Sequence, residues 1–186
     1  MKEKSIIWDP IIRLFHWTVA ATFLLNFLIF EEGGTLHRWA GYYILAALAV
    51  RIIWGFIGSK NARFKDFLPT ASGIKYHLQL LKARQFEVSD GHNPIGGLMI
   101  FALLFCLLCT GLSGWMMGLD PFWGEYWVEG LHGLMANTTM VLVVIHVAVV
   151  VLLSKFGPVN LIRQMITGQR ENSPIFVLTL LISSSY

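Results

Sequence analysis

Four of the six histidines in this sequence fall within or at the ends of long apolar runs, where an ionisable side chain is unusual. They are His16, His37, His132 and His146. A titratable group inside a membrane is costly, so each of these histidines is a candidate functional residue. For any one of them alone, hydrogen-bonded packing is the ordinary alternative.

The spacing of His132 and His146 favours a shared role. They are fourteen residues apart, which on a helix places them on the same side with a rise of roughly 21 Å between them. One therefore lies near each membrane face. His16 falls at the depth of His146, and His37 opens its run at the depth of His132. Depth thus predicts two pairs, His16 with His146 and His37 with His132.

Two imidazoles from facing helices, with no cysteine or carboxylate beside them, suit bis-histidine ligation of haem iron. A tetrahedral zinc site would need more ligands at one level. No Cys-x-x-Cys-His motif occurs, which excludes a covalent c-type haem. We therefore predict two non-covalent b-type haems, with His16 and His146 on the inner iron and His37 and His132 on the outer. Six-coordinate iron favours electron transfer over oxygen chemistry.

Arg51 supports this prediction, because an arginine in a membrane helix needs a partner. It lies fourteen residues after His37, on the same side but at the depth of the inner pair. An inner haem propionate would be a bidentate partner, and snorkelling to the nearby surface is the alternative. Arg38 and Arg13 are further candidates for cofactor binding.

Small residues also occur along the proposed helices. Cys106 and Cys109 are three residues apart, and we interpret them as packing residues rather than a redox or metal motif. Four glycines allow either close approach of a flat macrocycle or close helix packing. They are Gly41, Gly111, Gly114 and Gly133.

The elements that must position these residues are membrane helices. The 186 residues are 55% hydrophobic and 13% charged, and the mean hydropathy is +0.62. Four runs approach the ~20 residues that cross the bilayer, at about 11–30, 36–57, 94–119 and 130–156. They lack the alternation of barrel strands. We predict an all-α integral membrane four-helix bundle that holds the haems between its helices, as one domain over residues 1–170.

The chain ends need separate interpretation. The first run contains His16 and Asn26 and has no small-residue cleavage site, so we expect it to stay in the membrane. The tail at 171–186 has no assigned role, since its apolar stretch Pro174–Ile182 is too short to span.

Local signals predict where the helices begin and end. Asp9 and Thr35 are predicted to cap the first and second helices, with Pro10 at the first helical position. Gly157-Pro158 should end the fourth. Amphipathic segments at about Ala71–Arg84 and Val159–Thr167 are predicted to be surface helices at the membrane interface.

Basic residues predict the orientation. They flank the start of the first run, fill the second loop and follow the fourth run, whereas the third loop carries Asp120, Glu125 and Glu129. The positive-inside rule then places both termini and the second loop of this multi-pass chain in the cytoplasm. The pI of about 9.0 reflects this topology, and nothing indicates nucleic acid.

Several motifs together resemble one family. They are Arg-Leu-Phe-His-Trp at 13–17, Leu-His-Arg-Trp-Ala-Gly at 36–41, Arg51 with Trp54, Gly-His-Asn-Pro-Ile-Gly at 91–96, Thr-Gly-Leu at 110–112, Leu-His-Gly at 131–133 and Ile-His-Val at 145–147. Over about residues 6–170 the chain resembles the bacterial di-haem cytochrome b561 family, which includes the cytochrome b subunits of nickel-iron hydrogenases. The resemblance implies a four-helix haem bundle in a bacterial inner membrane, with the same two ligand pairs.

The resemblance also implies respiratory electron transport between the quinone pool and a redox partner such as a hydrogenase, a dehydrogenase or a c-type cytochrome. Quinone would be a substrate or bound ligand, so the chain is an electron carrier or a quinone-linked oxidoreductase. Our leading hypothesis places the partner in the periplasm, at the acidic loop 120–129. Hydrogenase-type members have longer chains with an additional helix, which argues against that assignment unless Pro174–Ile182 is its remnant.

Other functions stay open. One branch of the family oxidises superoxide and reduces quinone, but five acids against Arg38 in the outer loops disfavour an anionic substrate. A haem-free transporter or scaffold leaves the histidine depths unexplained. His92 is either a proton relay to quinone or a residue that hydrogen-bonds its turn, and we interpret His77 as an interfacial surface residue.

Overall fold

The computed structural model describes residues 6–82 and 94–170, and within these ranges every regular element is helical. Four helices are long and apolar enough to cross a membrane: α1 (Pro10–Leu28), α2 (Thr35–Ile57), α4 (Pro94–Met116) and α5 (Tyr126–Phe156). The predicted all-α membrane bundle is confirmed. At about 46 Å, the 31 residues of α5 exceed the ~30 Å of hydrocarbon, so its ends reach beyond the apolar layer.

The predicted capping residue is observed at the start of α1 but not at the start of α2. Asp9 caps α1 as predicted, accepting a hydrogen bond from the Ile12 amide at 2.9 Å, with Pro10 as the first helical residue. The prediction that Thr35 caps α2 is wrong. Gly34 is the capping residue and uses no side chain, because a turn through Gly33, at φ 70°, closes between Glu31 and Gly34.

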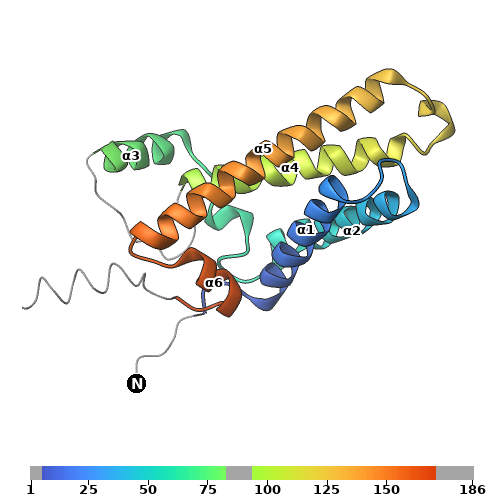
Figure 1. The fold of residues 1–186 in the computed structure, drawn as a ribbon. Helices are drawn as coiled ribbons and strands as arrows, with labels where there is room; N and C mark the ends of the chain where they lie inside the picture. Colours follow the sequence, from blue (N-terminus) through green and yellow to red (C-terminus); the bar gives the residue numbers. More distant parts are fainter. Residues whose placement is uncertain (1–5, 83–93, 171–186) are drawn as a thin grey trace, which may run out of the picture.

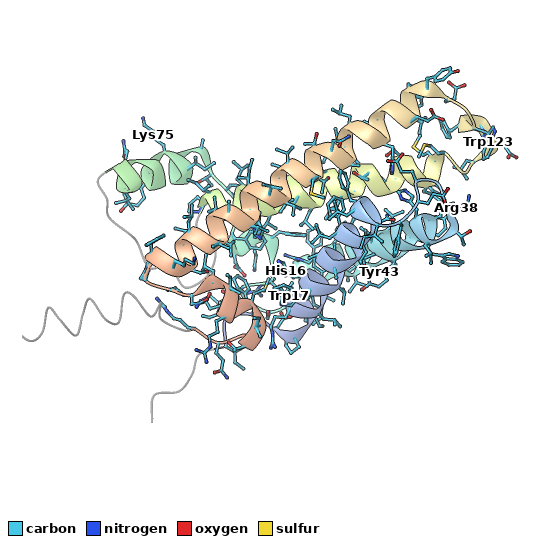
Figure 2. All side chains as sticks on the ribbon, viewed as in Figure 1. His16, Trp17, Arg38, Tyr43, Lys75 and Trp123 are labelled. Atoms are coloured by element: carbon cyan, nitrogen blue, oxygen red, sulfur yellow. The ribbon has the colours of Figure 1, made fainter. Side chains whose placement is uncertain are left out.

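The four long helices form two hairpins that lie side by side (Figure 1). α1 packs on α2, α2 on α4, and α4 on α5. The loops 29–34 and 117–125 lie at one end of the bundle, on the right of the view. We call this the acidic end, because its loops carry acidic residues. Figure 2 places Arg38 and Trp123 at this end and Lys75 toward the opposite one.

Three short elements gather at the opposite end, which we call the basic end after its lysines and arginines. They are η1 (Phe64–Asp66), α3 (Ala71–Lys82) and α6 (Leu161–Thr167). The two predicted surface helices are therefore present. α6 begins later than expected because Asn160 caps it by accepting from the Arg163 amide, and Arg84 lies outside the described residues. α5 ends with Gly157 as its cap, as predicted.

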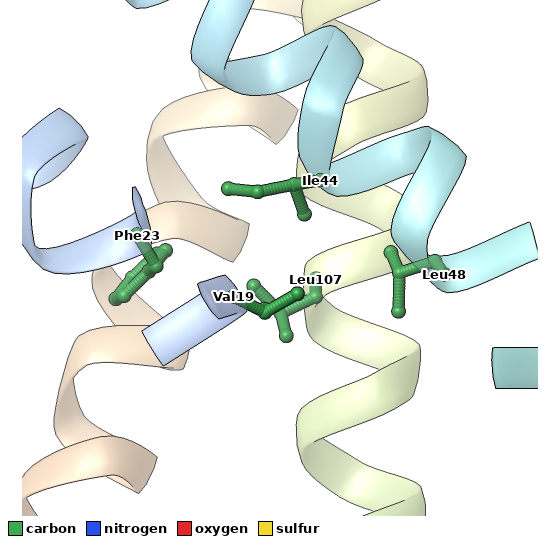
Figure 3. Close-up of a cluster of buried hydrophobic side chains, with 5 residues drawn as sticks. All are labelled: Val19, Phe23, Ile44, Leu48 and Leu107. Atoms are coloured by element: carbon green, nitrogen blue, oxygen red, sulfur yellow. The ribbon is translucent and has the colours of Figure 1, made fainter. Parts of the chain in front are cut away.

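A small apolar core occupies the middle of the bundle. Val19 and Phe23 from α1 meet Ile44 and Leu48 from α2, and Leu107 from α4 completes the cluster (Figure 3). Outside this core, large apolar side chains such as Phe56 and Leu134 are exposed, as expected where lipid replaces water. The buried face of α2 continues from Ile44 and Leu48 to Arg51.

Candidate haem-binding sites

The first histidine pair lies toward the basic end. His16 of α1 and His146 of α5 have ring centroids 6.3 Å apart, with the ring planes at 55°. These residues come from the first and last spanning helices, so the fold joins positions 130 residues apart in the chain. We call this the inner pair.

The second pair lies toward the acidic end. His37 of α2 and His132 of α5 have ring centroids 6.0 Å apart, with the planes at 67°. We call this the outer pair. The structure thus brings the four histidines together in the two combinations expected from their depths, while iron ligation by them stays a prediction.

The spacing within each pair can be compared with that of two imidazoles on one metal. An imidazole nitrogen binds a first-row metal at about 2 Å, and the ring centroid lies roughly 1 Å beyond it, so trans imidazoles place their centroids about 6 Å apart. The observed 6.3 and 6.0 Å agree with this value. Within residues 6–82 and 94–170, no third His, Cys, Asp or Glu joins either pair to make a metal site.

One histidine of each pair also has a buried nitrogen without a partner in the part of the chain that the structure describes. Nδ1 of His16 and Nδ1 of His37 are buried and have no hydrogen-bond partner among the described residues. Buried polar atoms are nearly always paired, so an orphaned one calls for a water, an ion or a ligand as its partner. Each pair therefore contains one imidazole whose Nδ1 the described residues leave without a partner.

His132 differs from these two histidines in its environment. Its Nδ1 lies 2.9 Å from the carbonyl oxygen of Thr110 and 3.3 Å from Oγ of Ser113, both on α4. A carbonyl oxygen can only accept, so Nδ1 carries the hydrogen and Nε2 keeps its lone pair for a metal. This contact was not predicted from the sequence, because any residue can supply a backbone carbonyl at position 110.

The glycines divide between the two roles considered for them. A methyl group added at Gly111 would lie 2.6 Å from Leu45, and one at Gly114 would lie 2.9 Å from the His132 ring, so both permit close side-chain packing. At Gly41 and Gly133 an added methyl would meet no described atom within 4 Å. These two positions therefore show no packing role against the described residues, and the close approach of a flat group to them stays a prediction.

Arg51 is buried, with 5% of its surface exposed. It lies six residues from the end of α2, and His16 lies six from the start of α1, which places them at the same level of the hairpin. Its Cζ stands 4.7 Å from the centroid of the Phe64 ring, but its Nη1 is buried without a hydrogen-bond partner among the described residues. A guanidinium with a free buried donor fits an anionic group such as a carboxylate.

The other two arginines have different surroundings. Arg13 donates through Nη2 to the carbonyl of Ile166 and so ties α1 to α6, and its Nε is buried without a described partner. Arg38 is exposed at the acidic end (Figure 2), and its side chain makes no hydrogen bond or ion pair that the described residues provide.

Asp9 connects α1, α2 and the loop that follows α2. Beyond its capping bond, it accepts from Nε1 of Trp54 at 3.0 Å and from Oγ of Ser59. Burial raises the pKa of Asp9, but the hydrogen bonds from Ser59, Trp54 and the backbone outweigh it, so the pKa lies below its ordinary value of 3.8. The carboxylate also interacts electrostatically with Arg51.

Comparisons with known proteins identify the family of this chain. The family described as prokaryotic cytochrome b561 matches residues 7–168, which include all four histidines. The chain is also similar to a probable Ni/Fe-hydrogenase B-type cytochrome subunit of Rhizobium leguminosarum bv. viciae. That relative is 26% identical over 221 aligned positions, which cover 91% of this chain and 90% of the relative.

The alignment with this relative is longer than the chain itself, so the relative carries inserted residues. The family match extends through all four spanning helices. The chain therefore belongs to the prokaryotic cytochrome b561 family and is a b-type cytochrome of the membrane that takes part in electron transfer.

Proposed function

We propose that this chain binds two b-type haems, one at each histidine pair, and passes electrons between the quinone pool and a soluble redox partner. The observation that carries the proposal is the pairing itself. Both ring separations, 6.3 and 6.0 Å, match two imidazoles on one iron. The two members on α5 are separated by a rise of roughly 21 Å, which puts one site toward each face.

The residues around the pairs would bind and shield the cofactors. Haem iron held by two histidines supplies reversible one-electron chemistry with no free coordination position. Arg51 would hold a propionate of the inner haem, with Arg13 as a second candidate there and Arg38 as a candidate beside the outer haem. Between the two sites, Met140 and Val143 of α5 pack against the buried apolar cluster that contains Leu48, and this apolar layer keeps water from the middle of the bundle.

The charge distribution supports one orientation. Lys60, Arg63, Lys65 and Lys75 lie at the basic end, which the positive-inside rule assigns to the cytoplasm. The acidic end then faces the periplasm of a bacterial inner membrane.

The acidic end is a suitable docking surface for a basic redox protein. Five exposed acids gather there against Arg38: Glu31, Glu32, Asp120, Glu125 and Glu129. Complementary charge speeds encounter with a partner of opposite sign. A c-type cytochrome or a dehydrogenase fits this description, and a hydrogenase is the class suggested by the name of the Rhizobium relative.

Quinone would exchange electrons at one of the two haems. A quinol releases two electrons and two protons, and a one-electron carrier accepts those electrons singly. His92, considered above as a proton relay, lies outside the described residues, so its role stays a prediction.

The proposal is tested on the purified full-length protein. Pyridine haemochrome analysis should give two protohaems per polypeptide, and a ubiquinol or menaquinol analogue should reduce both in stopped flow. One haem or none per chain would contradict the two-site proposal. Rapid quinone reduction with superoxide as the sole reductant would show that the protein oxidises superoxide, and the carrier function would then be wrong.

A further inference from the structure

α4 supplies no histidine to either pair, yet it holds the ring of His132. Three of its residues surround that imidazole: the Thr110 carbonyl at 2.9 Å from Nδ1, the Ser113 hydroxyl at 3.3 Å and Gly114. These positions fall on one face of α4, since residues three and four apart are neighbours on a helix. We call Thr110, Ser113 and Gly114 the α4 cradle.

Each member contributes a different constraint. The Thr110 carbonyl fixes the hydrogen on Nδ1. Ser113, with 1% of its surface exposed, lies 2.7 Å from the Cys109 carbonyl, to which its hydroxyl donates, so an oxygen lone pair remains for the Nδ1 hydrogen. Gly114 provides the space that the imidazole ring occupies, because a methyl group there would stand 2.9 Å from Cε1 and 3.2 Å from Nδ1 of His132.

The cradle distinguishes His132 from two of the other three histidines. Nδ1 of His16 and of His37 has no hydrogen-bond partner in the described part of the chain. Hydrogen bonding from the far nitrogen to a carbonyl orients a histidine ligand and raises its basicity. A more basic ligand stabilises oxidised iron more than reduced iron and so lowers the reduction potential.

We propose that the α4 cradle positions His132 and lowers the reduction potential of the outer haem, giving the two sites unequal potentials. This inference rests on the proposed function, in which His132 is an axial ligand. Thr110, Ser113 and Gly114 are positioning residues, acting through His132 without touching the iron.

The test compares Gly114→Ala with Gly111→Ala in the haem-loaded full-length protein. Both add one methyl group to α4, but the methyl at 111 would contact Leu45, at 2.6 Å, instead of His132. Redox titration followed by visible absorbance gives the two potentials, and low-temperature electron paramagnetic resonance of the ferric protein reports imidazole orientation. The signal of the outer haem is identified as the one lost in His132→Ala.

Gly114→Ala should raise the outer potential and change its resonance signal, with two haems retained and the inner potential unchanged. We expect about a tenfold shift of the redox equilibrium, equal to about 59 mV for one electron. Gly111→Ala should leave both potentials near wild type. Equal shifts of the outer potential in the two variants, or no shift in either, would overturn the proposal that the α4 cradle sets this potential.

Ser113→Ala keeps the test decisive if Gly114→Ala loses haem, because it removes an atom and cannot create a clash. It should shift the outer potential upward by a smaller factor, and an unchanged potential would then count against the cradle. Failure of the ligand assignment looks different, since His132→Ala would in that case retain two haems.

Discussion

The Phe64 ring covers the guanidinium of Arg51, with Cζ 4.7 Å from the ring centroid. Gly55 makes this possible, since a methyl group there would run into the Phe64 ring. An aromatic face stabilises a cation without using its N–H donors. The arrangement therefore holds Arg51 in place while leaving Nη1 available to a ligand.

Arg51→Met should weaken the inner haem and lower its reduction potential. Loss of a charged hydrogen bond costs about 1.5–3 kcal/mol, and loss of a nearby positive charge favours oxidised iron. Arg51→Lys should fall between wild type and Met, because an ammonium cannot make the bidentate contact. Haem titration of the apoprotein and redox titration measure both effects.

The matched control is Arg63→Met. Arg63 forms an exposed ion pair with Asp66 at 3.0 Å, and surface pairs of this kind contribute little. Equal losses of inner haem in the Arg51 and Arg63 variants would show that Arg51 has no specific role in haem binding.

Replacing one histidine of each pair should remove one haem each. His146→Ala is expected to lose the inner haem and His132→Ala the outer, because a single remaining imidazole leaves the iron with one axial ligand. Pyridine haemochrome analysis should fall from two haems to one, and different absorbance components should disappear. His77→Ala is the control and should retain both, whereas full haem content in either ligand variant would refute its assignment.

The histidine depths were predictable because they depend on helix periodicity and on the order in which the helices cross the membrane. Once α5 is a helix, fourteen residues place His132 and His146 on one side at different depths. The capping role of Asp9 was equally local. Thr35 was misassigned because the turn before it closes through backbone atoms, and any residue can supply those.

Contacts with backbone carbonyls of other helices could not be predicted from the sequence. The Thr110 carbonyl that holds His132 belongs to no side-chain pattern. Arg13 looked like a cofactor residue, but it also bonds to Ile166 of α6, which is distant in the chain. Such contacts depend on how the helices pack, and spacing within one helix does not specify that.

The stability that Asp9 contributes should disappear in acid. Its folded-state pKa lies below the ordinary value of 3.8, so the contribution is present above that pH and is lost as the pH falls through the lowered pKa. Asp9→Asn can still cap α1, but its neutral side chain lacks the carboxylate charge that strengthens the bonds from Trp54 and Ser59.

Thermal unfolding in detergent, followed by tryptophan fluorescence between pH 7 and pH 3, tests this. The difference in Tm between wild type and Asp9→Asn should be largest at neutral pH and shrink in the acid range. A difference that stayed constant down to pH 3 would show that the charge of Asp9 does not stabilise the fold.

The proposed orientation predicts which positions a membrane-impermeant maleimide can reach in intact cells. Glu125→Cys at the acidic end should be labelled, and Lys65→Cys at the basic end should be labelled only after the membrane is opened. The unmodified chain is the control, because Cys106 is buried and Cys109 half-buried. The reverse labelling pattern would invert the topology.

Electron exchange at the acidic end should depend on salt. With a small basic c-type cytochrome as the probe, the second-order rate should fall roughly tenfold as salt shortens the Debye length from about 30 Å at 0.01 M to about 3 Å at 1 M. Glu125→Gln with Glu129→Gln should lower the rate at low salt and flatten this dependence, since both acids are exposed there. Asp66→Asn, an exposed acid at the other end, should behave as wild type. If it lowered the rate as much as the double variant, the probe would not be docking at the acidic end.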